Sequence, residues 1–286
     1  MCQGPSTLSS AVSRRVAISA LGASLMAGLG ACSDGPSNPA PANQNPALAV
    51  SDTTSQTALA AAGSATTPPS PVATKRIRKS FIPDVGLPPV VNGLAPVITR
   101  ILTKHPVVFL TIDDGGTKNP EMAALMSQYD YPATIFLAQT FVKDNPTFFQ
   151  QFQAQGSLVE NHTISHNVNM VQKLGYAAQL AEITGMQGFA KDHYGRTPTL
   201  FRPPGGAYSN VMRKAVADAG LKAIITWEAK ASAGKMDYQY GNALRPGDIV
   251  LMHFRPEFAA DLAAFRQAQM AAGLEVVLLE DFLGVR

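Results

Sequence analysis

The sequence is poor in cysteine, and this scarcity excludes two kinds of stabilisation. Only Cys2 and Cys32 occur among the 286 residues. We interpret both below as parts of an export signal and its processing site, so the mature chain has no pair of thiols for an internal disulfide. It also has no thiolate to bind a metal. The fold therefore has to rest on its apolar core, and a hydrophobic content of 46% is ample for a large one.

Charged side chains are also few, at 15% of the sequence. The formal net charge of +3 is too small to indicate nucleic-acid binding. The basic residues are scattered along the chain, and their one cluster lies ahead of the motifs described below: Lys75, Arg76, Arg78 and Lys79. We interpret this cluster as a solvated surface patch, with attraction to an anionic wall polymer or membrane surface as the alternative. No protein partner is predicted.

The N-terminal residues have the pattern of an export signal. Arg14 and Arg15 precede an apolar stretch over residues 16–29, which is too short for a standard membrane span. The sequence LGAC that ends at Cys32 resembles the cleavage site of a bacterial lipoprotein, and the two arginines partly resemble a twin-arginine signal. We expect a signal over residues 1–31, lipid on Cys32 and an extracytoplasmic protein anchored to the membrane. An ordinary secretory signal and a secreted protein are the alternative.

The segment after the signal has a composition that does not support folding. Residues 32–74 are rich in Ala, Pro, Ser, Thr and Asn and have almost no large apolar side chains. Such a segment cannot bury enough apolar surface to offset its conformational entropy, so we expect a flexible tether. Residues 75–98 are apolar but interrupted by proline, and we expect them to pack as an irregular strap. The sequence therefore predicts a single catalytic domain over residues 75–286.

Apolar runs that suit strands alternate with helical patterns from residue 104 onward, and no internal repeat is apparent. The predicted strands cover residues 107–112, 133–137, 157–160, 199–202, 223–227, 248–253 and 275–279. The predicted helices include residues 120–128, 146–155, 171–191 and 211–219. This alternation indicates an α/β fold with a parallel sheet. Polar motifs follow several strands, and in a β/α barrel those strand ends form one rim, where active sites lie.

Histidine is scarce as well, because the chain holds only five. His162 and His166 are four residues apart, so they face the same way in a helical turn or converge in a tight loop. Asp113 and Asp114 end an apolar strand and precede a Gly-Gly turn. Two imidazoles and one carboxylate are a common ligand set for a catalytic metal. Asp114, His162 and His166 would complete such a set, and Asp113 would be free to act on water beside the metal.

The motifs resemble, in type and order, those of the polysaccharide deacetylase family, which is also the NodB homology domain and carbohydrate esterase family 4. They are TIDDG at residues 111–115, HTISH at 162–166, FRPPGG at 201–206 and IVLMH at 249–253. Each alone is compatible with a turn or a loop, and their conjunction on successive strand ends favours a metal hydrolase. The resemblance covers roughly residues 100–282. It implies a distorted, incomplete (β/α) barrel of about seven parallel strands, in agreement with the predicted strands.

The resemblance also implies a role for each residue of the site. The three ligands named above would hold a divalent metal, zinc first, with cobalt, nickel or manganese as alternatives. Asp113 would accept the proton of the attacking water, and Arg202 would orient Asp113. His253 would protonate the departing amine. A backbone N–H near Gly205 would bind the oxyanion, and Leu251 would line the pocket for the acetyl methyl group.

The sequence departs from the family pattern at two points. Gly205 stands where an aromatic residue is common, which removes a side chain from the substrate groove but keeps the backbone donor. The stretch that usually contains Asp and Trp is represented only by Trp227 and Glu228. Trp227 either lines the substrate site or packs in the core. Glu228 is a candidate replacement for the carboxylate that accompanies His253.

We expect a polysaccharide deacetylase, a hydrolase of linear amides, that removes N-acetyl groups from an amino-sugar polymer such as peptidoglycan or a chitin-like polymer. Two alternatives stay open. One is O-deacetylation of xylan or of an exopolysaccharide, which uses the same metal chemistry. The other is a non-catalytic wall-binding domain with a vestigial site. Asp113 and His253 argue against a binding domain, because such a domain needs neither a base nor an acid.

Overall fold

The computed structural model describes residues 81–286. The predicted signal over residues 1–31, the tether over residues 32–74 and the lipid-bearing Cys32 lie outside the described residues, as does the start of the predicted domain. No helix among the described residues combines the length and the apolar character that a membrane crossing needs.

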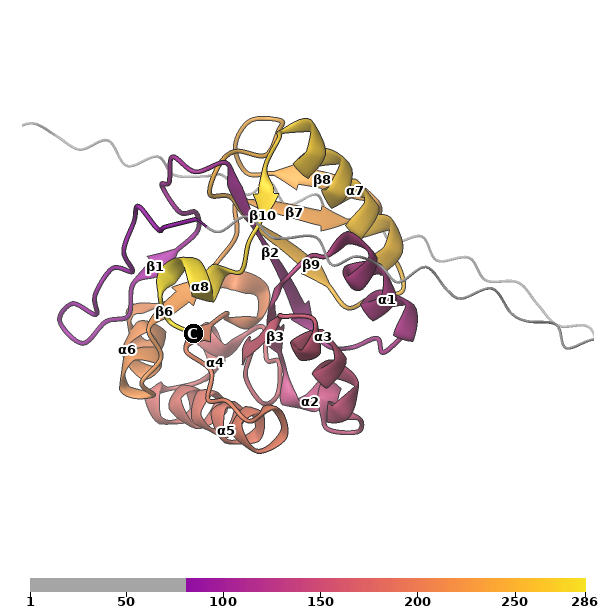
Figure 1. Ribbon diagram of the computed structural model, residues 1–286. Helices are drawn as coiled ribbons and strands as arrows, with labels where there is room; N and C mark the ends of the chain where they lie inside the picture. Colours follow the sequence, from indigo (N-terminus) through magenta and orange to yellow (C-terminus); the bar gives the residue numbers. More distant parts are fainter. Residues whose placement is uncertain (1–80) are drawn as a thin grey trace, which may run out of the picture. The chain divides into compact units, whose positions relative to one another are not determined.

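A ten-stranded sheet forms the centre of the fold, in the order β1-β6-β5-β4-β3-β2-β9-β7-β8, and β10 pairs with β2 off this path. The strands are β1 (Val97–Ile98), β2 (Val107–Asp114), β3 (Thr134–Leu137), β4 (Leu158–Asn161), β5 (Leu200–Phe201), β6 (Ala223–Ile225), β7 (Ala229–Ser232), β8 (Lys235–Tyr238), β9 (Ile249–His253) and β10 (Glu275–Val276). Every pairing is parallel except that of β7 with β8. The sheet curls into an incomplete barrel, which confirms the predicted fold class (Figure 1).

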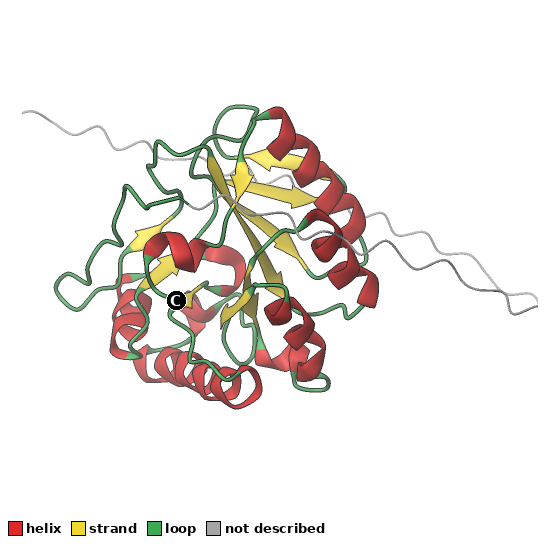
Figure 2. Ribbon diagram, viewed as in Figure 1, coloured by secondary structure: helices red, strands yellow, loops and turns green. Residues whose placement is uncertain are grey.

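Helices cover the outer side of the curled sheet (Figure 2). The α-helices are α1 (Pro120–Tyr129), α2 (Gln139–Val142), α3 (Gln150–Ala154), α4 (Met170–Lys173), α5 (Tyr176–Tyr194), α6 (Asn210–Asp218), α7 (Phe258–Ala271) and α8 (Leu279–Leu283), and the short 3-10 helices are η1 (Pro146–Phe149) and η2 (Pro204–Gly206). Local sequence explains their ends. Asn119 caps α1 by accepting from the Glu121 N–H, with Pro120 at the first helical position, and α5 is capped at its C-terminus by Gly195, whose φ is 73°.

The structure corrects several boundaries of the predicted elements. The strand predicted over residues 275–279 ends at Val276, and Leu279 instead begins helix α8. The strand predicted over residues 223–227 ends at Ile225, so Trp227 lies in the loop that follows. The expected strap contains strand β1, which pairs with β6. The predicted helix over residues 171–191 is divided between α4 and α5.

Alternation along β2 places its side chains in two separate cores. Val107 and Phe109 pack on the inner side of the sheet, in a cluster that also contains Leu279 and Phe282 of α8. Val108, Leu110 and Ile112 pack on the outer side against residues of α1, α3, α5 and α7. Because the register is fixed by these two apolar faces, Thr111 and Asp113 lie on the inner face at the end where β2 stops.

Two fully buried glutamates, Glu160 of β4 and Glu280 of α8, lie close enough for their charges to interact. Glu160 accepts from the Arg196 guanidinium and from the N–H groups of Thr199 and Leu200. Glu280 accepts from the Thr134 hydroxyl, at 2.6 Å, and in the part of the chain that the structure describes its other carboxyl oxygen has no hydrogen-bond partner. Burial, together with the negative charge of Glu160, raises the pKa of Glu280 well above its usual value. Of the two carboxyls, Glu280 therefore has the stronger tendency to keep its proton.

The Glu280→Gln variant is expected to become more stable than the wild type as the pH rises. Between the pKa of Glu280 in the unfolded chain and its higher pKa in the folded protein, the folded protein binds more protons than the unfolded chain. The wild type therefore loses stability as the pH rises through this interval. Glutamine keeps the acceptor for Thr134 and removes the ionisable group. Thermal melts at pH 4 and pH 8 should show a gain for the variant at pH 8 on the order of 1 kcal/mol or more, since one pKa unit corresponds to about 1.4 kcal/mol.

The control for this measurement is Asp281→Asn, which changes the half-exposed neighbour of Glu280 on the same helix. It removes one carboxylate without touching the buried pair, so its pH dependence should follow the wild type. If the stabilities of Glu280→Gln and the wild type changed equally between pH 4 and pH 8, Glu280 would ionise normally in the folded protein.

Candidate metal centre and active site

The predicted site residues come together at the carboxyl ends of the parallel strands. Asp113 and Asp114 end β2, and His253 ends β9 directly beside Asp113 in the register of the sheet. His162 follows β4, and Arg202 follows β5. Parallel strands point their carboxyl ends to one rim of a barrel, so residues far apart in the chain meet there.

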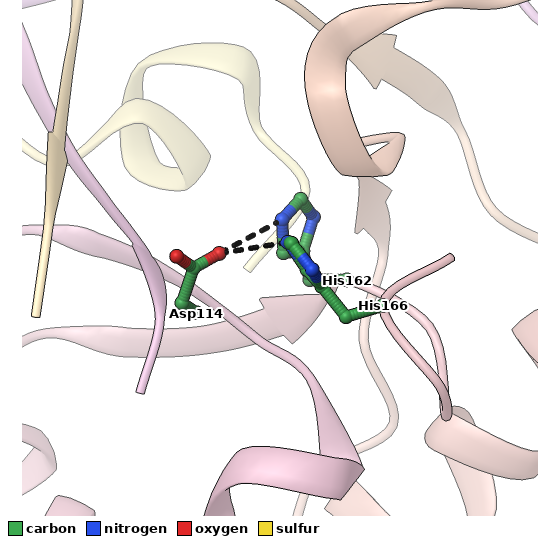
Figure 3. Close-up of side chains that lie close together, drawn as sticks. All are labelled: Asp114, His162 and His166. Carbon is green, nitrogen blue, oxygen red and sulfur yellow. Dashed lines mark ion pairs between the residues drawn. The ribbon is translucent and has the colours of Figure 1, made fainter. Parts of the chain in front are cut away.

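Three of these side chains converge on one point (Figure 3). Asp114 Oδ1 lies 2.9 Å from His166 Nε2 and 3.4 Å from His162 Nε2. Their ligand atoms all lie within 4.8 Å of one another. Asp114 Oδ1 is buried and, within residues 81–286, accepts no hydrogen bond of good geometry, which is costly for a buried carboxylate oxygen. A divalent cation between two imidazoles and this oxygen would satisfy it, so the residues fit a metal of the type that nitrogen and oxygen ligands bind.

The charge on Asp114 also suits a cation. Burial opposes its ionisation, but its contacts with His162 and His166 outweigh burial and hold the pKa of the carboxyl well below its usual range. His162 is 2% exposed, and its Nδ1 lies 2.7 Å from the carbonyl oxygen of Arg202. If that nitrogen carries the proton and donates it to the carbonyl, Nε2 presents its lone pair to the metal position.

Unusual backbone angles explain how neighbouring aspartates reach the same site. Successive side chains of a strand point to opposite faces, so Asp113 and Asp114 would diverge in a regular strand. Asp114 has a φ of 76°, and Gly115 follows with a φ of 87°. This turn brings the Asp114 carboxylate to the rim. A Cβ on Gly115 would lie 2.4 Å from Val142 Cγ1, so the turn also needs a residue without a side chain.

The loop that carries both histidines is held by polar contacts on several sides. Thr163 has a φ of 74°, which is rare for a β-branched residue, and its N–H donates to Asn161 Oδ1 at 3.0 Å. The N–H groups of Ile164 and Ser165 both donate to Glu182 of α5, at 3.1 and 2.9 Å. Strained conformations of this kind persist only where surrounding structure enforces them, and they concentrate at functional sites.

Asp113 is fixed by a buried arginine. Arg202 has no exposed surface, and its Nη1 donates to Asp113 Oδ1 at 2.8 Å and to Thr111 Oγ1 at 2.7 Å. Its Nε and Nη2 donate to the carbonyl oxygens of Ile225 and Thr226, at 3.1 Å each. The guanidinium carbon lies 4.4 Å from the centre of the Phe136 ring. Such a set of contacts holds the Asp113 carboxylate in one orientation.

His253 is partly buried beside this pair. Burial lowers the pKa of its imidazole below the usual value, although the carboxylates of Asp113 and Asp114 act in the opposite direction. A lower pKa means that the imidazolium releases its proton readily. Leu251 lies two residues earlier in β9, on the same face as His253, and is buried.

The remaining predicted residues lie beside the rim. Gly205, with a φ of 69°, is exposed. It borders a cavity of about 280 Å³, lined by Thr99, Gly205, Gly206, Tyr208, Thr226, Trp227 and Gln239. Trp227 is half-buried, and a Cβ on Gly206 would lie 2.6 Å from its ring. Trp227 therefore borders this cavity as well as packing against the core.

Glu228 does not accompany His253 in the structure. Its carboxylate accepts from Arg245 Nη2 at 2.6 Å, and its N–H donates to the carbonyl oxygen of Ile249, at the first residue of β9. His253 is at the last residue of that strand, so the two side chains lie at opposite ends. The interpretation of Glu228 as its carboxylate partner is wrong, and the carboxylates that act on His253 are those of Asp113 and Asp114.

Two residues near the site were given no role in the predicted site. Thr111 lies on the same face of β2 as Asp113 and accepts from Arg202, and strand periodicity was the signal that pointed to it. Arg255 follows His253 by two residues, and its Nη2 lies 3.6 Å from Asp114 Oδ2. No sequence pattern marked Arg255, because its place depends on how the chain turns after β9.

Comparison with known proteins agrees with this geometry. A family model described as polysaccharide deacetylase matches residues 101–224. An uncharacterized protein of Streptomyces coelicolor, SCO4760, is 35% identical over 196 residues, which are 66% of this chain and 78% of that protein. A peptidoglycan-N-acetylglucosamine deacetylase of Bacillus cereus is 28% identical and covers 59% of this chain and 67% of its own.

A solved structure shares the fold. BA3943 from Bacillus anthracis, described as a CE4 family pseudoenzyme, superimposes with a TM-score of 0.57 at 22% identity and covers 67% of this chain and 70% of its own. This likeness shows the fold alone. Together with the sequence matches and the rim described above, it establishes that the chain belongs to the polysaccharide deacetylase family.

Proposed function

We propose that this protein is a metal-dependent hydrolase that removes N-acetyl groups from amino-sugar polysaccharides. The observation that carries the proposal is the presence, at one rim, of the Asp114, His162 and His166 triad together with the Asp113–Arg202 pair and His253. A divalent cation on the triad, zinc being our first candidate, supplies a Lewis acid that activates water and polarises the acetyl carbonyl. Relatives that deacetylate peptidoglycan glycans support the substrate class.

The side chains of the chain itself supply the proton transfers in this proposal. Asp113 accepts the proton of the attacking water, and Arg202 keeps its carboxylate ionised and aimed at the rim. His253 donates a proton to the departing amine. Because burial lowers the pKa of His253, the imidazole gives up its proton easily but holds it in only a fraction of molecules at neutral pH. The Gly205 N–H, on an exposed left-handed turn, is our candidate donor to the oxyanion.

Two other functions need to be separated from this one. O-deacetylation uses the same metal and oxyanion chemistry, so the geometry of the rim does not discriminate between an amide and an ester. A non-catalytic role has a precedent in the fold, since BA3943 is described as a pseudoenzyme. Against it stands the Asp113–Arg202 pair, because a buried charge pair is expensive to maintain without a use for the charge.

Acetate release tests the three functions directly. The purified protein, loaded with zinc, is incubated with N-acetylated chitotetraose, with peptide-free peptidoglycan glycan and with acetylated xylan. We expect acetate from the amino-sugar polymers, loss of that activity on chelation, and its return when zinc is restored. Acetate from xylan alone would establish an O-deacetylase, and no acetate from any polymer by the zinc-loaded protein would favour the binding domain. The membrane anchor and the extracytoplasmic location stay predictions.

A further inference from the structure

An arginine that no motif contains lies beside the metal triad. Arg255 is half-exposed, and its Nη2 lies 3.6 Å from Asp114 Oδ2, the carboxylate oxygen that does not face the histidines. At that distance the contact is electrostatic and is not a hydrogen bond. Within residues 81–286, no hydrogen bond to the Arg255 guanidinium is found. Its donors are therefore available to a ligand at the mouth of the site.

The other cations close to the rim are already engaged. Arg202 is fully buried and donates to Asp113, Thr111 and two backbone carbonyls. Lys118 lies close to the histidine loop, but its ammonium donates to the carbonyl oxygen of Phe141 and pairs with Asp144 at 3.0 Å. Among the described residues, Arg255 is thus the cation at this rim that is both accessible and without a strong partner.

The place of Arg255 has a cost that a ligand would offset. A guanidinium next to Asp114 repels a divalent cation on the same carboxylate, and this repulsion weakens metal binding. Binding of a neutral sugar would not offset this repulsion. An anion of the substrate would be attracted by both the metal and the guanidinium, and the planar fork of arginine suits a carboxylate, which it binds through two parallel hydrogen bonds.

We propose that Arg255 binds a carboxylate of the substrate next to the acetyl group that is removed, so that the enzyme prefers amino-sugar polymers with free carboxylates. The proposal rests on the proposed deacetylase function. A suitable substrate is N-acetylmuramic acid, which carries a carboxylate on a lactyl group. An ether oxygen joins this group to the ring carbon next to the one that bears the acetamido group. N-acetylglucosamine has no such charge. Arg255 would then decide which of the two sugars of a peptidoglycan glycan is deacetylated.

The test uses two glycans, of which one has charged and the other uncharged lactyl groups. One is a peptide-free peptidoglycan oligosaccharide with free lactyl carboxylates, and the other is the same oligosaccharide with these carboxylates converted to methylamides. The zinc-loaded wild type should show a kcat/KM at least about tenfold higher on the acidic glycan, because hydrogen bonds to charged groups are among the strongest in proteins. In Arg255→Gln this ratio should fall to about one, chiefly through KM, and Arg255→Lys should retain part of it.

Two controls separate recognition from support of Asp114. Arg286→Gln makes the same change of charge at an exposed arginine that pairs with Asp281 of α8, and should keep the full preference. Zinc content is measured for every variant. If Arg255 only supports the metal ligand, Arg255→Gln would lose zinc and lose activity on both glycans equally, and the unchanged ratio would overturn the proposal. A wild type without preference for the acidic glycan would overturn it too.

Failure of the deacetylase function is distinguishable from failure of this inference. If the zinc-loaded wild type releases acetate from neither glycan nor from N-acetylated chitotetraose, the proposed function is wrong. The role of Arg255 is then decided by calorimetric binding of the same two glycans. The wild type should bind the acidic glycan at least about tenfold more tightly, and Arg255→Gln should bind both alike. Equal affinities in the wild type would refute carboxylate recognition.

Discussion

The His162→Ala variant is expected to lose its metal and, with it, deacetylation by at least about a hundredfold, because one of three protein ligands disappears from a site that needs all of them. His162 is well placed for so large an effect. It is 2% exposed, and its Nδ1 lies 2.7 Å from the Arg202 carbonyl oxygen, which fixes the ring so that Nε2 faces Asp114. Elemental analysis of the purified variant should find far less than one divalent ion for each chain.

The matched control is His193→Ala, which removes an exposed imidazole at the end of α5, outside the site. This variant should keep the metal and the activity of the wild type. Asp114→Asn should weaken the metal less completely, and excess zinc should restore part of its activity, since mass action fills a weakened site. Unchanged metal content in folded His162→Ala would exclude the triad as the metal site.

The fold was largely predictable because its strands carry strong patterns. The runs over β2, β3 and β9 are continuous apolar segments, as expected for parallel strands buried on both faces. The hairpin of β7 and β8 was missed because its sequences, AKAS and KMDY, are short and only half-buried. Leu279 was predicted to lie in a strand because its neighbours are apolar. It instead belongs to helix α8 and packs against the inner core, and a short apolar run does not distinguish a buried strand from a buried helix.

The site was predictable as a set of residues but not as an arrangement. Motif order named the ligands, and strand ends explained why Asp114, His162 and His166 meet. The positive φ of Asp114 has no signal in the sequence except the glycines that follow it. Glu228 was misassigned because the prediction rested on its position next to Trp227 in the sequence. That position does not reveal the ion pair that the Glu228 carboxylate forms with Arg245 in the fold. Tertiary contacts of this kind are decided by the fold.

The Asp113→Asn variant should separate the general base from the metal ligand beside it. Asparagine keeps the shape and an acceptor for Arg202 Nη1, but it cannot take the proton of the attacking water, so kcat should fall by at least about a hundredfold, the usual scale for loss of a general base. The metal content should stay that of the wild type, because the three ligands are intact. Steady-state kinetics and elemental analysis of the same preparation measure both quantities.

Arg202 makes this variant a structural test as well as a catalytic one. The guanidinium has no exposed surface, and loss of its partner's charge leaves a buried cation that only neutral acceptors satisfy. Breaking a buried ion pair costs up to about 3–5 kcal/mol, and the retained hydrogen bond reduces that cost, so a lower melting temperature is expected. Kinetics must therefore be measured where circular dichroism shows a folded variant, with Asp218→Asn, which breaks an exposed pair with Lys214, as the control. If folded, metal-loaded Asp113→Asn kept full activity, water would be activated by another group, and the buried Asp113–Arg202 pair would serve the architecture of the rim alone.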